Sequence, residues 1–177
     1  MALIRKTTTL DFDDVRNVYV QAFPENERDL VAKLAADLLC ATTSPPTISF
    51  LAESEGKIVG HVAFSPVTLE ENADTRAYIL APLAVLPDFQ RRRIGSELVK
   101  AGLRSVQTAG ADLLFVYGDP DYYGRFGFSS ETAASYTPPY DLQYPFGWQA
   151  IDLHGEFSSK TPSRISCVDA LCHRELW

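Results

Sequence analysis

One stretch of the sequence constrains the fold more than any other, because it passes from an apolar run through a basic turn into a helix. Residues 83–86 are apolar, Pro87 breaks the run, residues 91–93 are three arginines, and a helical pattern begins at Ile94. The first N–H groups of a helix have no intrahelical acceptor, and the helix dipole adds positive charge there. Guanidinium groups supply further donors. The stretch therefore predicts an anion-binding turn that suits a phosphate.

The helix and the strand that follow the basic turn predict a parallel crossover. Between residues 93 and 108 the charged side chains fall in one arc of the helical wheel, so the apolar remainder packs on a sheet. Gly110 is placed to end that helix. Residues 113–117 form a continuous apolar run, which is typical of a strand buried on both faces. We expect this strand to lie parallel to the one before the turn.

Upstream of the basic turn, the pattern predicts one strand, two helices and three antiparallel strands. The expected strands are residues 2–5, 48–53, 57–69 and 77–86, and the expected helices begin near residues 11 and 26. Ser54-Glu55-Gly56 is typical of a hairpin turn. Pro82 cannot donate a ladder hydrogen bond, so we expect a bulge there that splays the strand from its next neighbour and opens a slot.

The segment after residue 130 is rich in proline and aromatic residues. Residues 146–157 and 164–168 are weaker strand candidates within it. We expect its aromatic side chains to pack on the sheet, with an acceptor pocket or an interface as alternatives. These side chains are Tyr136, Tyr140, Tyr144, Phe146 and Trp148.

Charge and composition exclude several classes of partner. The net charge of −7, from 16 basic and 23 acidic residues, does not suit general binding of nucleic acid. No apolar run approaches the roughly 20 residues of a membrane helix, so we expect no membrane partner. The charged residues Arg5 and Lys6 are followed by polar threonines, so the apolar segment and small-residue cleavage site of a signal peptide are not seen. We therefore expect a single domain over residues 1–177, located in the cytoplasm.

Cysteine and histidine spacing does not match a metal site or a disulfide framework. The three cysteines are an odd number and include no Cys-x-x-Cys pair. Cys167, Cys172 and His173 lack a fourth ligand at a recognisable spacing, so we expect no metal. The sequence also has no Gly-x-Ser-x-Gly elbow and no Walker loop, so a nucleophilic serine and a nucleoside triphosphate are not expected.

Two motifs resemble those of the GNAT superfamily of acetyl-CoA-dependent N-acetyltransferases. Residues 90–95, Gln-Arg-Arg-Arg-Ile-Gly, resemble its Gln/Arg-x-x-Gly-x-Gly/Ala pyrophosphate loop. Residues 122–128, Tyr-Tyr-Gly-Arg-Phe-Gly-Phe, resemble its Tyr-x-x-x-Gly-Phe segment. The longer strings 81–85 and 118–128 resemble a bacterial branch of predicted acetyltransferases. One departure is that Arg93 replaces the first loop glycine and adds a Cβ near the expected phosphate.

The resemblance implies an α+β fold and an acyltransferase activity. The fold would be a mixed, mostly antiparallel central sheet splayed at a bulged strand, with helices on both faces. Residues 2–130 would form the core, and residues 131–177 would complete the sheet and the acceptor side. The enzyme would move an acetyl group from acetyl-CoA to a primary amine of a small molecule or peptide by direct attack, as a monomer or homodimer. The alternative is a module that binds CoA or acyl-CoA without efficient transfer.

The resemblance also implies a role for particular residues in binding the cofactor. The backbone of Leu83 would face the acetyl carbonyl, and the backbone of Val85 would pair with pantetheine. The implied cofactor-binding residues are Leu83, Ala84, Val85, Gln90, Arg91, Arg92, Arg93, Ile94, Gly95, Ser96 and Tyr122.

The catalytic residues implied by the resemblance are an acid and a base. Tyr123 matches the family's tyrosine, and a phenol with an ordinary pKa of about 10 can protonate a departing thiolate. Tyr122 is the alternative acid. Glu27 is the candidate base, with Asp119 or a chain of water molecules as alternatives. His61 falls within an expected strand, and we interpret it as structural.

Overall fold

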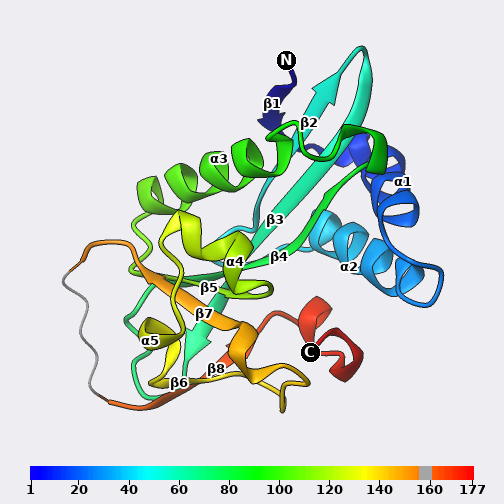
Figure 1. The fold of residues 1–177 in the computed structure, drawn as a ribbon. Helices are drawn as coiled ribbons and strands as arrows, with labels where there is room; N and C mark the ends of the chain where they lie inside the picture. Colours follow the sequence, from blue (N-terminus) through cyan, green and yellow to red (C-terminus); the bar gives the residue numbers. More distant parts are fainter. Residues whose placement is uncertain (156–160) are drawn as a thin grey trace. The chain divides into compact units, whose positions relative to one another are not determined.

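The computed structural model describes residues 1–155 and 161–177 (Figure 1). The contacts within these residues divide them into two compact units. The first unit contains Met1–Phe64 and Ala81–Ser105, and the second contains Ser65–Leu80 and Val106–Trp177. Strands β3 (Lys57–Leu69) and β4 (Ala77–Val85) and helix α3 (Ile94–Thr108) run through both units. Within the described ranges, no helix is both long and apolar enough to span a membrane.

The strands form a mixed, mostly antiparallel sheet, as predicted. Its order is β1-β2-β3-β4-β5-β7, and β8 pairs with β3 and β6. In the first unit, β1 (Leu3–Lys6) and β3 both lie antiparallel to β2 (Ile48–Ser54). The predicted hairpin is confirmed, because Glu55 and Gly56 join Ser54 to its partner Lys57 with φ angles of 54° and 73°. Positive φ at both central residues is typical of a two-residue hairpin turn.

Helices cover both faces of the first unit's strands, as predicted. Helices α1 (Phe12–Ala22) and α2 (Arg28–Cys40) lie side by side (Figure 1). Their face of β3 includes His61, whose ring lies 5.6 Å from that of Tyr19 in α1. Phe64 lies on the opposite face, where a Cβ at Gly102 of α3 would approach the Phe64 ring to 1.9 Å. The two-residue period of a strand therefore directs alternate side chains into two separate helical layers.

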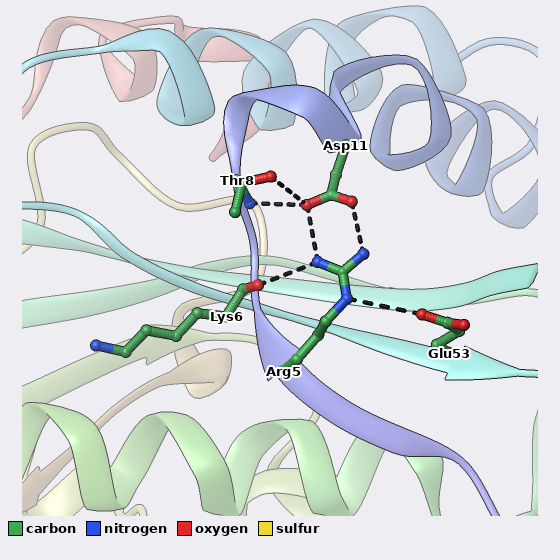
Figure 2. A network of polar contacts seen from close by, with 5 residues as sticks. All are labelled: Arg5, Lys6, Thr8, Asp11 and Glu53. Carbon is green, nitrogen blue, oxygen red and sulfur yellow. Dashed lines mark hydrogen bonds and ion pairs between the residues drawn. The ribbon is translucent and has the colours of Figure 1, made fainter.

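A network of charged and polar groups ties β1 to the start of α1 (Figure 2). The guanidinium of Arg5 donates to both carboxylate oxygens of Asp11 at 2.7 and 2.9 Å. The N–H and hydroxyl of Thr8 donate to the same carboxylate at 2.8 and 2.9 Å. Arg5 also lies 3.6 Å from Glu53 and donates to the Lys6 carbonyl at 3.3 Å. The carboxylate of buried Asp11 is thus fully engaged.

The second unit contains the predicted parallel strand. Strand β5 (Leu113–Tyr117) lies parallel to β4 from Ala77↔Leu113 to Leu80↔Val116, and antiparallel to β7 (Trp148–Asp152). The ladder between β4 and β5 ends two residues before Pro82. β4 itself continues to Val85, with a cis peptide bond between Ala81 and Pro82. Gly110, with a φ of 78°, follows α3 as predicted.

Short elements complete the second unit after β5. They are α4 (Pro120–Tyr123), α5 (Ser130–Ala133), β6 (Tyr136–Thr137) and β8 (Ser163–Cys167). The two weaker strand predictions correspond to β7 and β8, although the end of the first one, residues 156–157, lies outside the described residues. The core of this part forms around Phe115, whose ring lies 5.2 Å from those of both Tyr136 and Trp148.

Candidate functional site

The basic turn between β4 and α3 has an unusual backbone. Arg91 and Arg93 have φ angles of 59° and 64°, in the left-handed region that glycine usually occupies. Gln90 fixes the turn to the end of β4, because its side-chain amide donates to the Val85 carbonyl at 3.1 Å. The Arg93 carbonyl accepts a hydrogen bond from the Glu97 N–H at 3.0 Å and so starts the helix. Arg93 therefore adopts a backbone conformation that glycine takes at little steric cost.

The three arginines of the turn are exposed and carry unbalanced positive charge. In the part of the chain that the structure describes, none of them forms an ion pair with a carboxylate. The guanidinium of Arg92 lies over the Phe89 ring at 5.0 Å from its centroid. Unpaired guanidinium groups beside a helix start are suited to hold a phosphate or pyrophosphate.

The start of α3 and the end of β4 contribute backbone groups to the same region of the first unit. The N–H groups of Ile94, Gly95 and Ser96 have no intrahelical acceptor, because they lie in the first turn of α3. The Ile94 side chain is buried, so that residue can offer a ligand only its backbone. In β4, Ala84 is buried against α1 and α2, whereas Leu83 and Val85 are partly exposed.

Tyr123 lies in the second unit, in the short helix α4. Its partly buried ring packs edge-on against Phe128 at 5.7 Å, and a Cβ at Gly118 would lie only 2.4 Å from it. Burial raises the pKa of the Tyr123 phenol, and the charges of Tyr122 and Asp119 raise it further. The phenol is therefore protonated at neutral pH and suits a proton donor rather than a base.

Tyr122, the alternative acid, has different surroundings. The guanidinium of Arg125 lies 4.3 Å from the centroid of its ring, and the Phe126 ring lies at 5.7 Å. Its ring also meets that of Tyr123 edge-on at 4.9 Å. The Tyr122 ring therefore packs between Arg125, Phe126 and Tyr123.

The candidate bases occupy helix starts. Glu27, in the first unit, is the N-cap residue of α2 and is exposed. Asp119, in the second unit, is the N-cap residue of α4 and accepts a hydrogen bond from the Asp121 N–H at 2.9 Å. Capping accounts for the Asp119 carboxylate, so Glu27 is left as the freer of the two carboxylates.

His61 is a buried side chain of β3, in line with its interpretation from the sequence. It is only 1% exposed, and its Nδ1 lies 2.9 Å from the hydroxyl of Tyr19. Burial lowers the pKa of His61 to about 3, while the nearby charge of Asp11 opposes that shift. Sequence reasoning missed this contact, because nothing local relates residues 42 positions apart.

The aromatic tail packs only in part as expected. Tyr136 and Trp148 are buried in the second unit, which confirms the prediction for those two side chains. Tyr144 and Phe146 are 53% and 65% exposed, so the packing prediction is wrong for them. Among residues 1–155 and 161–177, no three histidine, cysteine or acidic side chains gather in a group that could hold a metal ion.

Comparison with known proteins identifies the family. The model of the acetyltransferase (GNAT) family matches residues 12–128, which include β4, the basic turn, α3 and α4. The chain belongs to the GNAT family. As a GNAT member with relatives named as N-acetyltransferases, it is an N-acetyltransferase.

Two Escherichia coli K12 relatives are similar to this GNAT chain. YjhQ, named as an uncharacterised N-acetyltransferase, is 34% identical over 168 residues, which cover 92% of this chain and 90% of YjhQ. YhbS, also named as an uncharacterised N-acetyltransferase, is 34% identical over 127 residues, which cover 71% of this chain and 72% of YhbS.

Two solved GNAT structures are similar to this chain over most of their length. The E. coli YhbS structure in complex with CoA has a TM-score of 0.82 and 27% identity, and the alignment covers 96% of this chain and 91% of YhbS. A GNAT acetyltransferase from Brucella melitensis in complex with acetyl-CoA has a TM-score of 0.70 and 28% identity, with 96% and 97% covered. Both similarities confirm the predicted fold class.

Proposed function

We propose that this GNAT enzyme transfers an acetyl group from acetyl-CoA to a primary amine by direct attack within a ternary complex. The observation that supports this most is the turn before α3, where three exposed arginines, with no acidic partner among the described residues, adjoin helix N–H groups that have no intrahelical acceptor. Similar structures hold CoA or acetyl-CoA, which supports the same co-substrate here. The residues of the turn, 90–96, would hold the pyrophosphate.

The end of β4 would orient the thioester. In this proposal the Leu83 N–H donates to the acetyl carbonyl, and it stabilises the negative charge that develops on that oxygen as the amine attacks. The backbone of Val85 pairs with the pantetheine arm, with Ala84 between them anchored in the core. Holding the thioester beside the amine supplies much of the rate increase, because it converts a bimolecular reaction into an effectively unimolecular one.

Proton transfers complete the proposed reaction. Glu27 accepts a proton from the attacking amine, directly or through water, and Tyr123 gives its proton to the departing CoA thiolate. The Tyr123 phenol is protonated at neutral pH, as a proton donor must be, while its raised pKa makes it a weaker acid than a free phenol.

The proposed acceptor is a small molecule or a peptide that carries a primary amine. The net charge of −7 supports a cationic acceptor, because long-range attraction favours its approach. A cytoplasmic location and a homodimer remain predictions from the sequence.

The test combines ligand binding with an amine screen. We expect acetyl-CoA and CoA to raise the melting temperature, and thiol release from acetyl-CoA to appear with at least one amine of a broad panel. Arg91→Ala should weaken CoA binding about tenfold, whereas the control Arg16→Ala, which removes an exposed arginine from α1, should not. Absence of stabilisation by either ligand would contradict the proposal. Stabilisation without turnover on any amine would favour the binding module instead.

A further inference from the structure

A buried chain of polar groups reaches the backbone of β4 inside the first unit. The hydroxyl of Tyr19, in α1, lies 2.9 Å from Nδ1 of His61, 3.1 Å from the Pro82 carbonyl and 3.2 Å from the His61 carbonyl. Tyr19 is 0% exposed and His61 is 1% exposed. A hydroxyl carries a single hydrogen, so the position of the histidine proton decides which of these contacts forms.

Hydrogen-bond counting assigns that proton to Nδ1. If Nε2 carried it, the Tyr19 hydroxyl would donate to Nδ1, and the buried Nε2–H would have no partner among the residues that the structure describes. If Nδ1 carries it, Nδ1–H donates to the Tyr19 oxygen, and the Tyr19 hydrogen can donate to the Pro82 carbonyl at 3.1 Å, which is nearer than the His61 carbonyl at 3.2 Å. The second arrangement makes one more hydrogen bond and leaves no N–H unsatisfied.

The end of this chain is the peptide group that carries the Leu83 N–H. In a trans peptide the C=O and the following N–H point in opposite directions, so a donor on the Pro82 carbonyl fixes where the Leu83 N–H points. Hydrogen bonds in series also polarise one another in a low-dielectric interior, by an order of 10–30% per bond. A bond from Tyr19 to the Pro82 carbonyl therefore makes the Leu83 N–H a stronger donor.

We propose that Tyr19 and His61 are positioning residues for acetyl transfer, which orient the Pro82–Leu83 peptide group and strengthen the Leu83 N–H as a donor to the acetyl carbonyl. The inference rests on the proposed function, in which that N–H contacts the thioester. In addition, the orientation and strength of the Leu83 N–H depend on two buried side chains, Tyr19 and His61, that do not contact the substrate. Burial keeps His61 uncharged at physiological pH, so the order of donors and acceptors from His61 through Tyr19 to Pro82 does not change with pH in that range.

The infrared stretch of the bound acetyl carbonyl tests the inference without an amine. With acetyl-CoA labelled with ¹³C at the carbonyl, we expect a lower stretching frequency on binding to the wild type. Tyr19→Phe should lose at least half of that shift and change CoA affinity less than about twofold. Tyr78→Phe removes another buried phenol, one that is not part of the hydrogen-bond series from His61 through Tyr19 to Pro82, and should keep the full shift in carbonyl frequency. Equal shifts in wild type and Tyr19→Phe would overturn the inference and leave the proposed function intact.

Two further measurements keep the test decisive. If wild type fails to bind acetyl-CoA, the proposed function and this inference fall together. The ¹⁵N spectrum of wild-type His61 should show a protonated Nδ1 and an unprotonated Nε2, and it needs no variant to fold. A protonated Nε2 would overturn the inference.

Discussion

At the scale of single residues, the turn before α3 holds two arginines in a conformation that suits glycine. For L residues the left-handed region costs roughly 1–2 kcal/mol per residue. Arg91 and Arg93 adopt it with φ angles of 59° and 64°, and Arg92 between them has no positive φ. The turn thus has guanidinium groups at two positions where glycine would cause less backbone strain. This implies that positive charge at these positions contributes more to function than the strain costs in stability.

This strain predicts opposite effects for two neighbouring substitutions. Arg93→Gly should raise the free energy of unfolding by about 0.5–1 kcal/mol, because relief of the left-handed backbone outweighs the added entropy of the unfolded chain. Arg92→Gly should lower it by a similar amount, since no such strain is relieved. Urea denaturation of both variants measures the difference. Equal destabilisation by both would contradict the strain argument.

The two tyrosines of α4 should separate clearly in activity. Tyr123→Phe removes the proposed acid and should lower kcat by about 10²-fold, whereas Tyr122→Phe should stay within about threefold of wild type. The measurement is steady-state thiol release with an acceptor found in the amine screen. Full activity in Tyr123→Phe would remove the acid assignment.

At the scale of elements, the Arg5–Asp11 pair joins β1 to the start of α1. Asp11→Asn should lower the free energy of unfolding by about 2 kcal/mol, because a buried, charge-assisted network loses its acceptor. The control Asp37→Asn breaks an exposed pair with Lys33 on α2 and should cost less than about 0.5 kcal/mol. Urea denaturation at pH 7 compares them. Equal costs would contradict the network's importance.

Two buried groups of the first unit, Asp11 and His61, predict two acid-sensitive pH ranges, which overlap between about pH 3 and 4. The hydrogen bond from Arg5 holds the pKa of Asp11 well below its usual range, so its stabilisation is complete above about pH 4 and is lost below that. Burial lowers the pKa of His61 to about 3, so only the unfolded chain takes up that proton between about pH 6.5 and 3. Acidification through that second range should therefore favour unfolding, by about 1.4 kcal/mol per pH unit.

His61→Asn isolates the second range, because asparagine does not titrate there. Unfolding free energies measured across that range should fall less steeply with acidification in His61→Asn than in wild type. Parallel slopes would show that His61 is protonated in the folded state.

At the scale of the whole molecule, the two units share continuous elements. β3, β4 and α3 each begin in one unit and end in the other, so melting one unit disrupts strands or a helix of its neighbour. We expect a single thermal transition, with a calorimetric enthalpy equal to the van't Hoff enthalpy. Two resolved transitions in differential scanning calorimetry would contradict this.

Local patterns in the sequence predicted most of the fold, but they did not predict contacts between residues far apart in the sequence. The turn Ser54-Glu55-Gly56, the helix α3 and the strand Leu113–Tyr117 each depend on neighbours in sequence, and each was predicted correctly. β6 has only two residues, too few for a pattern. The partners of Tyr19 are 42 and 63 positions away, and only the folded sheet brings them to α1. Arg93 was identified as a departure, but nothing in the sequence indicated that Arg91 shares its conformation.

The left-handed arginines also matter for how this protein would respond to laboratory evolution. Selection for heat resistance alone would favour glycine at positions 91 and 93, since each such change relaxes the backbone. The same changes remove the charge proposed to hold the pyrophosphate. A library screened only for thermal stability would therefore yield variants that are more stable but bind acetyl-CoA weakly. A screen of this protein should select for stability and co-substrate binding together.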